Sequence, residues 1–303
     1  MSNWKTAAEI EPKETISGII YGDVGIGKTT MALSAPYPAL FDIEKGLDRV
    51  QQKHFAIDTP IVQSENWDEL NLDVKTMPKE RETIVIDSMA KSLEMLIDDI
   101  CIKFPNLLQR DGTPSQKAYG QRKKLFKEFM KSIKCKDKNL IFICHEEFED
   151  NGDGTFKKTP ALGTKNQNFL GLIVDDLDFI GYMSMTGKRR TIAFNNTSQY
   201  RGKNSIGLDE FITVPTLEDN EHNTFLTDYI IKPTIAHRKA EKAEAKKQLQ
   251  LIEQGKLLIS QSKDPNKTLD EFKKMELGVY AKTLLFKELC ASTDMTFKDG
   301  RFE

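Results

Sequence analysis

Short apolar runs alternate with amphipathic stretches over residues 16–215. This alternation predicts an α/β domain built on a largely parallel sheet. Six runs rich in β-favouring residues are predicted strands: Ile16–Tyr21, Ala39–Ile43, Thr83–Ile86, Leu140–Cys144, Phe179–Met183 and Thr191–Asn195. The last two flank the turn sequence MTGKRR, so they are expected to form an antiparallel hairpin at the edge of the sheet.

One segment between the strands has a clear helical period. Gln121–Lys138 places five apolar side chains on one face of a helix: Leu125, Phe126, Phe129, Met130 and Ile133. Its other face is predicted to carry a basic stripe: Arg122, Lys123, Lys127, Lys131 and Lys134. Two polar, glycine-containing stretches, 104–118 and 146–168, are expected to be non-helical, and NGDG in the second suits the tip of a hairpin.

The pattern changes after Pro215. The alanine-, lysine- and glutamate-rich stretch that follows Pro233 predicts a helix that continues to Gly255 or a little beyond. A break at SKDPNK precedes two further predicted helices, which are separated near Gly278. We therefore expect two domains, an α/β domain at 1–215 and a helical C-terminal region at 216–303.

Composition narrows the functional classes only slightly. The 303 residues are 39% hydrophobic and 30% charged with a net charge of −2, which fits a soluble globular protein and neither requires nor excludes a nucleic-acid partner. The four cysteines lack the paired spacing of a metal site, which fits a reducing compartment. No apolar run approaches the roughly 20 residues that span a bilayer, and the N-terminus lacks a signal-peptide core. We expect a cytoplasmic protein without a membrane partner.

The stretch YGDVGIGKTT directly follows the first predicted strand. Its spacing, a glycine, four residues and then Gly-Lys-Thr, is the P-loop pattern, in which backbone N–H groups surround phosphate oxygens. Lys28 can reach the β- and γ-phosphates of a nucleotide, and the Thr29 hydroxyl can bind Mg²⁺. An ordinary glycine-rich turn without a ligand is the alternative. The predicted nucleotide-binding residues are Gly22, Asp23, Val24, Gly25, Ile26, Gly27, Lys28, Thr29 and Thr30.

Three further polar residues end predicted strands, where α/β sheets place their ligands. Asp87 ends the apolar run TIVID, as a Walker B aspartate that helps to hold Mg²⁺ does. Residue 88 is serine, so a catalytic base must come from elsewhere, and Glu44 in FDIEKGLD is the candidate for orienting water. A surface glutamate is the other interpretation of Glu44. His145 follows the strand LIFIC and is either a hydrogen-bonding sensor of the γ-phosphate or a simple loop histidine.

Together, GDVGIGKTT, FDIEKGLD, IVIDSM and IFICHEE resemble the RecA/RadA core. More closely, they resemble phage-encoded RecA-like P-loop nucleotide-binding proteins, the phage AAA-domain ATPases that include the Sak-type single-strand annealing ATPases. The resemblance covers roughly residues 15–215. It implies a phosphate-binding role for Lys28, Mg²⁺ binding by Thr29 and Asp87, and a catalytic role for Glu44. His145 stands at the sensor position, where RecA has a glutamine.

The resemblance also implies contacts outside the P-loop. The segment YRGKN matches the place where RecA-like proteins present basic residues to a neighbouring subunit's ATP, so Arg201 and Lys203 are candidates; solvated surface is the alternative. The segment after the sensor strand contacts DNA in that family. Here its second half carries the candidate DNA-binding residues, Phe156, Lys157, Lys158 and Lys165. The basic stripe of helix 121–138 is a second candidate, or simply a solvated helix face.

These observations lead to one functional hypothesis and two rivals. We expect a Mg²⁺-dependent ATPase of phage DNA recombination, single-strand annealing or replication, located in the host cytoplasm. Its expected partners are single-stranded DNA and further copies of the chain in a ring or filament, with a single-strand-binding protein as a further candidate. A P-loop kinase would need an arginine-rich lid, which the sequence lacks. A nucleotide-gated DNA-binding scaffold without turnover would not need Glu44.

Overall fold

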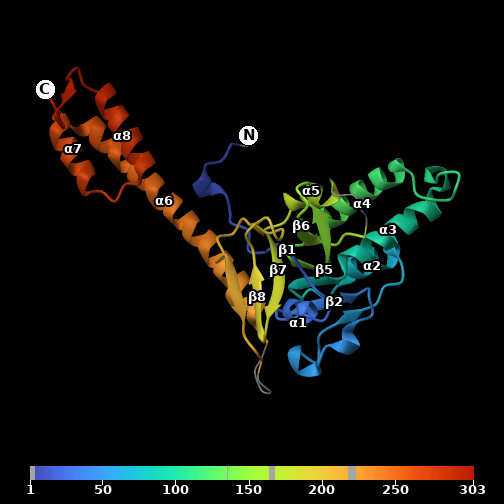
Figure 1. Cartoon of the computed structure of the whole chain (residues 1–303). Helices are drawn as coiled ribbons and strands as arrows, with labels where there is room; N and C mark the ends of the chain where they lie inside the picture. Colours follow the sequence, from blue (N-terminus) through green and yellow to red (C-terminus); the bar gives the residue numbers. More distant parts are fainter. Residues whose placement is uncertain (1–3, 135, 164–167, 218–222) are drawn as a thin grey trace. The chain divides into compact units, whose positions relative to one another are not determined.

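A large sheet forms the centre of the chain in the computed structural model, which describes residues 4–134, 136–163, 168–217 and 223–303 (Figure 1). Its strands lie in the order β10-β8-β7-β1-β5-β4-β2-β3. Neighbours from β3 to β7 are parallel, whereas β8 and β10 are antiparallel to their neighbours. Their bounds are β1 (Ser17–Gly22), β2 (Pro38–Asp42), β3 (Ile61–Val62), β4 (Thr83–Asp87), β5 (Asn139–Asp150), β7 (Phe179–Thr186), β8 (Arg189–Ala193) and β10 (Phe211–Val214).

Two short strands join this sheet away from its main row. β6 (Phe156–Pro160) pairs antiparallel with the outer half of β5, so 146–160 is a hairpin with NGDG at its tip, as expected. β9 (Lys203–Asn204) pairs with the amino end of β7. The predicted β7–β8 hairpin is present, and β10 is the strand outside it.

The strand order explains where the polar strand ends meet. β5 lies between β1 and β4, so the register places Gly22 opposite His145. Asp42 of β2 is opposite Asp87 of β4. All four residues therefore reach the same carboxyl edge of the parallel strands, where such sheets bind ligands.

Helices α2 (Trp67–Thr76), α3 (Met89–Lys103) and α4 (Gln116–Lys134) supply the apolar side chains that pack on one face of the sheet. Trp67, Phe126, Phe129 and Phe142 form an aromatic cluster within this core, with ring centroids 5.0–6.3 Å apart. The remaining helices of this region are α1 (Lys28–Ala32) and α5 (Asn168–Val174). Shorter 3-10 turns occur at Ala7–Glu9, Leu47–Arg49, Gln52–His54 and Pro105–Leu107, and a π-helical turn at Thr227–Ile231.

The helix predicted at 121–138 is shifted and its basic stripe is smaller. α4 begins at Gln116 and ends at Lys134. Arg122 lies four residues before Phe126 and shares its buried face, with its guanidinium over the rings of Tyr119 and Phe169 at 5.0 and 5.2 Å. Placing Arg122 in an exposed stripe was therefore wrong. Lys134 pairs with Asp176 at 2.7 Å.

The chain divides into two compact units, Glu14–Thr234 and a second unit of Met1–Lys13 with Ile235–Glu303. The second unit contains α6 (Lys232–Gln261, which begins in the first unit), α7 (Pro265–Lys274), α8 (Val279–Ala291) and a terminal hairpin of β11 (Phe297–Lys298) and β12 (Arg301–Phe302) (Figure 1). α6 continues past Gly255 because Leu285 of α8 packs there; a Cβ at Gly255 would lie 2.4 Å from its Cδ1. The expected helical C-terminal region and α/β core are both confirmed. In the described ranges, every helix is too short or too polar to cross a membrane.

Candidate active site

The loop between β1 and α1 has the shape of a phosphate-binding loop. Gly25 and Gly27 adopt left-handed backbone angles, with φ of 75° and 97°, which other residues reach only with strain. Lys28 is buried, and its Nζ donates hydrogen bonds to the carbonyl oxygens of Gly22 (3.0 Å) and Asp23 (2.7 Å). Burial lowers the pKa of Lys28, although nearby acids such as Asp87 oppose the shift. The ammonium group is thus held over the loop, ready to exchange these carbonyl contacts for phosphate oxygens.

Thr29 and Asp87 meet beside this loop. The Thr29 hydroxyl donates a 2.6 Å hydrogen bond to Oδ2 of Asp87. Burial raises the pKa of Asp87 against the effect of that hydrogen bond, and the neighbouring acids Glu44 and Asp42 raise it further. A divalent cation would relieve this crowding of acids, and a hydroxyl with a carboxylate is an oxygen donor set that suits Mg²⁺. The pair predicted as the Mg²⁺ site therefore fits that ion.

Both carboxylate oxygens of Glu44 are held by side chains from the neighbouring strands. The Ser88 hydroxyl donates a short hydrogen bond to Oε1, and Nε2 of His145 lies 3.1 Å from Oε2. An ionised carboxylate can only accept, so Nε2 of His145 carries the proton in this contact. Burial alone would raise the pKa of Glu44, but these two hydrogen bonds outweigh it and the pKa lies below its ordinary value. Glu44 is still 31% exposed, so water can reach it.

Backbone contacts fix the turn that carries Glu44. The backbone N–H groups of Ile43 and Glu44 both donate to the Asp87 carbonyl oxygen, at 2.7 and 3.1 Å. The buried carboxylate of Asp42 accepts hydrogen bonds from the Gly46 N–H (2.9 Å) and the Gln63 side chain (3.0 Å). The end of β2 is thereby tied to the end of β4, and Glu44 has a defined place at the carboxyl edge.

These contacts form a single arrangement: a lysine over a glycine-rich loop, a threonine–aspartate pair and a second, doubly held carboxylate. A family model described as "AAA domain" matches residues 14–206, which is more than half of the chain. The chain belongs to the AAA domain family.

Other proteins are more distant from this AAA domain. No curated protein of known function shows significant sequence similarity to the chain. Similar solved structures include the ATPase domain of a helicase, with a TM-score of 0.38, 10% identity and coverage of 66% of this chain and 81% of that one. The RadB recombinase structure has a TM-score of 0.37, 14% identity and coverage of 69% of this chain and 89% of that one.

Two residues of this AAA domain act at the site without having been singled out in the sequence. Ser88 was considered only as a missing glutamate, yet its hydroxyl holds Glu44. Arg190 of β8 donates from Nε to the Ile26 carbonyl oxygen at 3.0 Å, which places a guanidinium beside the P-loop. Its signal was present in the turn TGKRR, because the turn between β7 and β8 lies at the same edge as Gly22.

Lys203 has structural contacts in the AAA domain. Its Nζ donates to the carbonyl oxygens of Val174 and Leu177, at 2.6 Å each, and so binds the carboxyl end of α5. β9 itself pairs with the amino end of β7, opposite the edge that carries the P-loop. Arg201 makes backbone contacts, since its carbonyl oxygen accepts the Tyr21 hydroxyl at 2.7 Å. The structure does not bring the Lys203 amine to the phosphate site of its own chain.

The β5–β6 hairpin holds the residues expected to contact DNA, and its lysines face the protein. Lys157 donates to Oδ1 of Asn196 at 2.8 Å. Lys158 donates to the Tyr182 hydroxyl at 2.8 Å and pairs with Glu146 at 3.0 Å. Lys165 lies outside the described residues. Phe156, by contrast, is 61% exposed.

A second exposed ring, which the sequence interpretation did not include, accompanies Phe156. Phe148 is 64% exposed, and Phe148 pairs with Lys158 while Phe156 pairs with Asp150. Because side chains at alternate positions share a face, Phe148 and Phe156 lie on the same face of the hairpin. The hairpin therefore presents aromatic rings more openly than it presents positive charge.

Proposed function

We propose that this AAA domain is a Mg²⁺-dependent ATP hydrolase. The observation that carries the proposal is the position of Glu44, which Ser88 and His145 hold by both oxygens at the sheet edge that carries the P-loop. A carboxylate that keeps a low pKa and is reached by water suits the activation of a water molecule. A nucleotide-binding protein without turnover has no use for that arrangement.

Each residue then has a role that its contacts support. Lys28 exchanges its carbonyl partners for β- and γ-phosphate oxygens, and the loop N–H groups bind the remaining phosphate charge. Thr29 and Asp87 would hold Mg²⁺, which when bound neutralises charge on the phosphates. Glu44 orients the attacking water and accepts its proton. His145 contacts Glu44 directly, so it is placed to pass the state of the site into β5 and its hairpin.

We further propose that the ATPase acts on single-stranded DNA as a ring or filament, in phage recombination, annealing or replication. The four sequence motifs support this by their resemblance to phage RecA-like ATPases. The exposed pair Phe148 and Phe156 supports it independently, since bases of single strands stack on such rings. In that assembly Arg201 is the candidate for contacting a neighbour's ATP, and a single-strand-binding protein is a candidate partner.

Phosphate release separates this proposal from its two rivals. We expect the wild-type protein to release phosphate from ATP only with Mg²⁺, and faster with single-stranded oligonucleotides. Asp87→Asn should abolish most of the release, whereas Asp98→Asn, an exposed aspartate of α3, should not. Binding of ATP without release would favour the scaffold. Disappearance of ATP without free phosphate would favour a kinase.

A further inference from the structure

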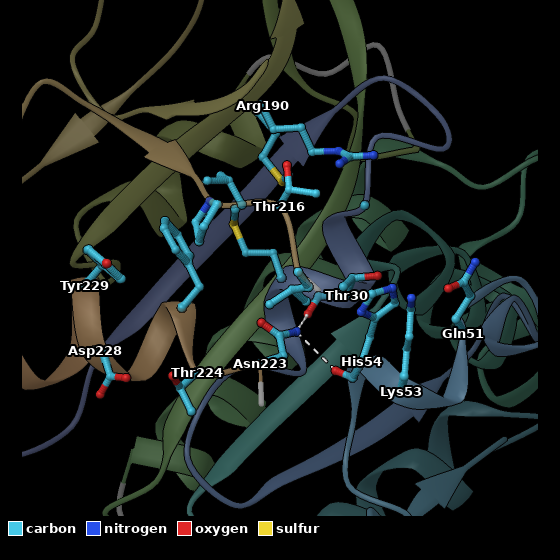
Figure 2. Close-up of a pocket in the computed structure, with 17 residues that line it drawn as sticks. Thr30, Gln51, Lys53, His54, Arg190, Thr216, Asn223, Thr224, Asp228 and Tyr229 are labelled. Carbon is cyan, nitrogen blue, oxygen red and sulfur yellow. Dashed lines mark hydrogen bonds between the residues drawn. The ribbon is translucent and has the colours of Figure 1, made fainter. Parts of the chain in front are cut away.

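A cavity of about 670 Å³ opens beside the P-loop, on the side formed by Gly27, Thr30 and Met31 (Figure 2). Neither Glu44 nor Asp87 lines it, so it is separate from the edge where hydrolysis is proposed. Its volume lies within the range of about 300–1,000 Å³ that is usual for small-molecule sites. A nucleotide whose phosphates occupy the P-loop must place its nucleoside somewhere next to the start of α1.

One end of the cavity is aromatic. Phe225 is buried, and Tyr229 stacks on it with ring centroids 5.1 Å apart and an interplanar angle of 21°. Tyr229 is 53% exposed, so the ring face that Phe225 leaves uncovered is accessible. A parallel-stacked tyrosine with one accessible face is a platform for another flat ring. In Figure 2, Tyr229 and Asp228 lie on the opposite side of the pocket from Lys53 and Gln51, with Thr30 and Asn223 between them.

Hydrogen bonds fix this aromatic wall to the P-loop helix. The buried Asn223 amide donates to the carbonyl oxygens of Thr30 (2.7 Å) and His54 (3.1 Å), as the dashed lines in Figure 2 show. Leu226 N–H donates to the Ser34 hydroxyl at 2.8 Å, and the Thr227 hydroxyl donates to the Ser34 carbonyl oxygen at 2.7 Å. The wall is therefore held at a set distance from the loop rather than lying loosely beside it.

The wall does not belong to the part of the chain that the family model matches. That match ends at residue 206, whereas the wall comes from residues 214–217 and 223–229. The same segment leads directly into α6. The charge of the cavity is graded, since Arg190 and Lys53 line it together with Gly27 of the P-loop, while Asp228 stands beside Tyr229.

We propose that this cavity binds the nucleoside of a purine nucleoside triphosphate, with the base stacked on Tyr229 and with Arg190 near the phosphates. This inference rests on the proposed function and adds its base-binding subsite. A bicyclic base covers more of the tyrosine ring than a pyrimidine, so the subsite favours ATP and GTP over CTP and UTP. The base is thus recognised by a segment that lies outside the family domain and begins the long helix α6.

Equilibrium binding of two kinds of ligand tests the subsite. One set comprises the β,γ-imido analogues of ATP, GTP and CTP, and the other is inorganic tripolyphosphate, which has no base. Tyr229→Ala should weaken binding of the ATP analogue by about tenfold, in line with losses for base stacking, and leave tripolyphosphate unchanged. Tyr229→Phe should retain the wild-type affinity. Tyr280→Ala, which removes another exposed tyrosine, is the matched control and should bind all ligands normally.

A second variant guards against a loss through misfolding. Thr216 is exposed and lines the cavity, so Thr216→Trp should fill it and exclude the nucleotides while tripolyphosphate still binds. An equal loss of both ligand classes in Tyr229→Ala, or no loss at all, would overturn the subsite. So would a wild-type protein that binds tripolyphosphate as tightly as the ATP analogue, although the P-loop would then stand. Failure of the wild type to bind any of these ligands would overturn the P-loop assignment as well.

Discussion

The carboxyl edge of the sheet and the β5–β6 hairpin were both expected to carry function, and their side chains differ in where they point. At the edge, Lys28, Thr29, Asp87, Glu44 and His145 converge through direct contacts. On the hairpin, Lys157 and Lys158 turn back to protein acceptors. Residues that end parallel strands are placed by sheet topology, whereas a lysine in a loop takes whichever acceptor the fold brings near it.

The largest effect should come from the lysine at the edge. Lys28→Met keeps the apolar length but loses the charge, so ATP affinity should fall about tenfold to a hundredfold, equivalent to about 1.5–3 kcal/mol. Equilibrium titration with an ATP analogue measures this. Lys45→Met, which alters an exposed lysine in the turn after β2, is the matched control. Normal affinity in a folded Lys28→Met protein would remove the basis for treating the edge as a phosphate site.

The hairpin provides the opposite test, because rings rather than lysines should matter there. Phe148→Ala and Phe156→Ala should each weaken binding of a labelled oligo-dT by about 1–3 kcal/mol. Phe211→Ala removes a ring of similar exposure on β10 and serves as the control. Lys157→Met should change affinity little, because its amine is bound to Asn196. If the lysine variant loses affinity and the phenylalanine variants do not, the hairpin binds DNA by charge and the contrast between edge and hairpin fails.

Ser88 allows a finer test of the edge. Ser88→Ala removes a hydrogen bond that lowers the pKa of Glu44, so that pKa should rise. Glu44 works as a carboxylate, so turnover falls as the pH drops through its pKa. The acidic limb of kcat should therefore move to higher pH in the variant, and kcat at neutral pH should fall by about tenfold.

Loss of a helix cap is the effect to separate from this one. Ser88 also caps α3, and Asn66 caps α2 away from the site, so Asn66→Ala is the matched control. Both variants should lose some stability, typically about 1 kcal/mol. Only Ser88→Ala should shift the pH profile; an unshifted profile would show that Ser88 does not set the protonation of Glu44.

The smallest effect concerns Lys203. Because its amine binds two carbonyl oxygens at the end of α5, Lys203→Met should reduce the free energy of unfolding by about 1 kcal/mol. Turnover per folded molecule should stay within about twofold of wild type. Lys188→Met, at the exposed β7–β8 turn, is the control for losing a lysine. Unchanged stability with impaired turnover would instead support the contact with a neighbour's ATP.

Periodicity and strand-end position predicted the sheet, the hairpin turns and the place of Asp87, Glu44 and His145, since these depend on local pattern and on parallel pairing. Contacts between distant segments were not predictable in this way. Ser88 reaches Glu44 only because β2 and β4 are neighbours. Lys158 turns inward because tertiary packing places the Tyr182 hydroxyl beside it.

The cavity wall shows the same limit more strongly. Residues 223–229 carry no motif, and their place beside the P-loop depends on Asn223 bonding to Thr30 and His54, which lie 193 and 169 positions away in the chain. Arg122 is the opposite case, because its spacing from Phe126 already placed it on the buried face. There the period was informative and the preference of arginine for the surface was misleading.

Glu44→Gln is the decisive substitution for the view that the edge activates water against a bound nucleotide. It keeps the size of the side chain and removes its charge. In single-turnover experiments with Mg²⁺ and ATP, we expect ATP binding within about twofold of wild type and phosphate release slowed by about 10²-fold or more. Glu80→Gln, at an exposed glutamate, should behave as wild type. Release at the wild-type rate in Glu44→Gln would show that the catalytic base lies elsewhere and that the edge does not work in this way.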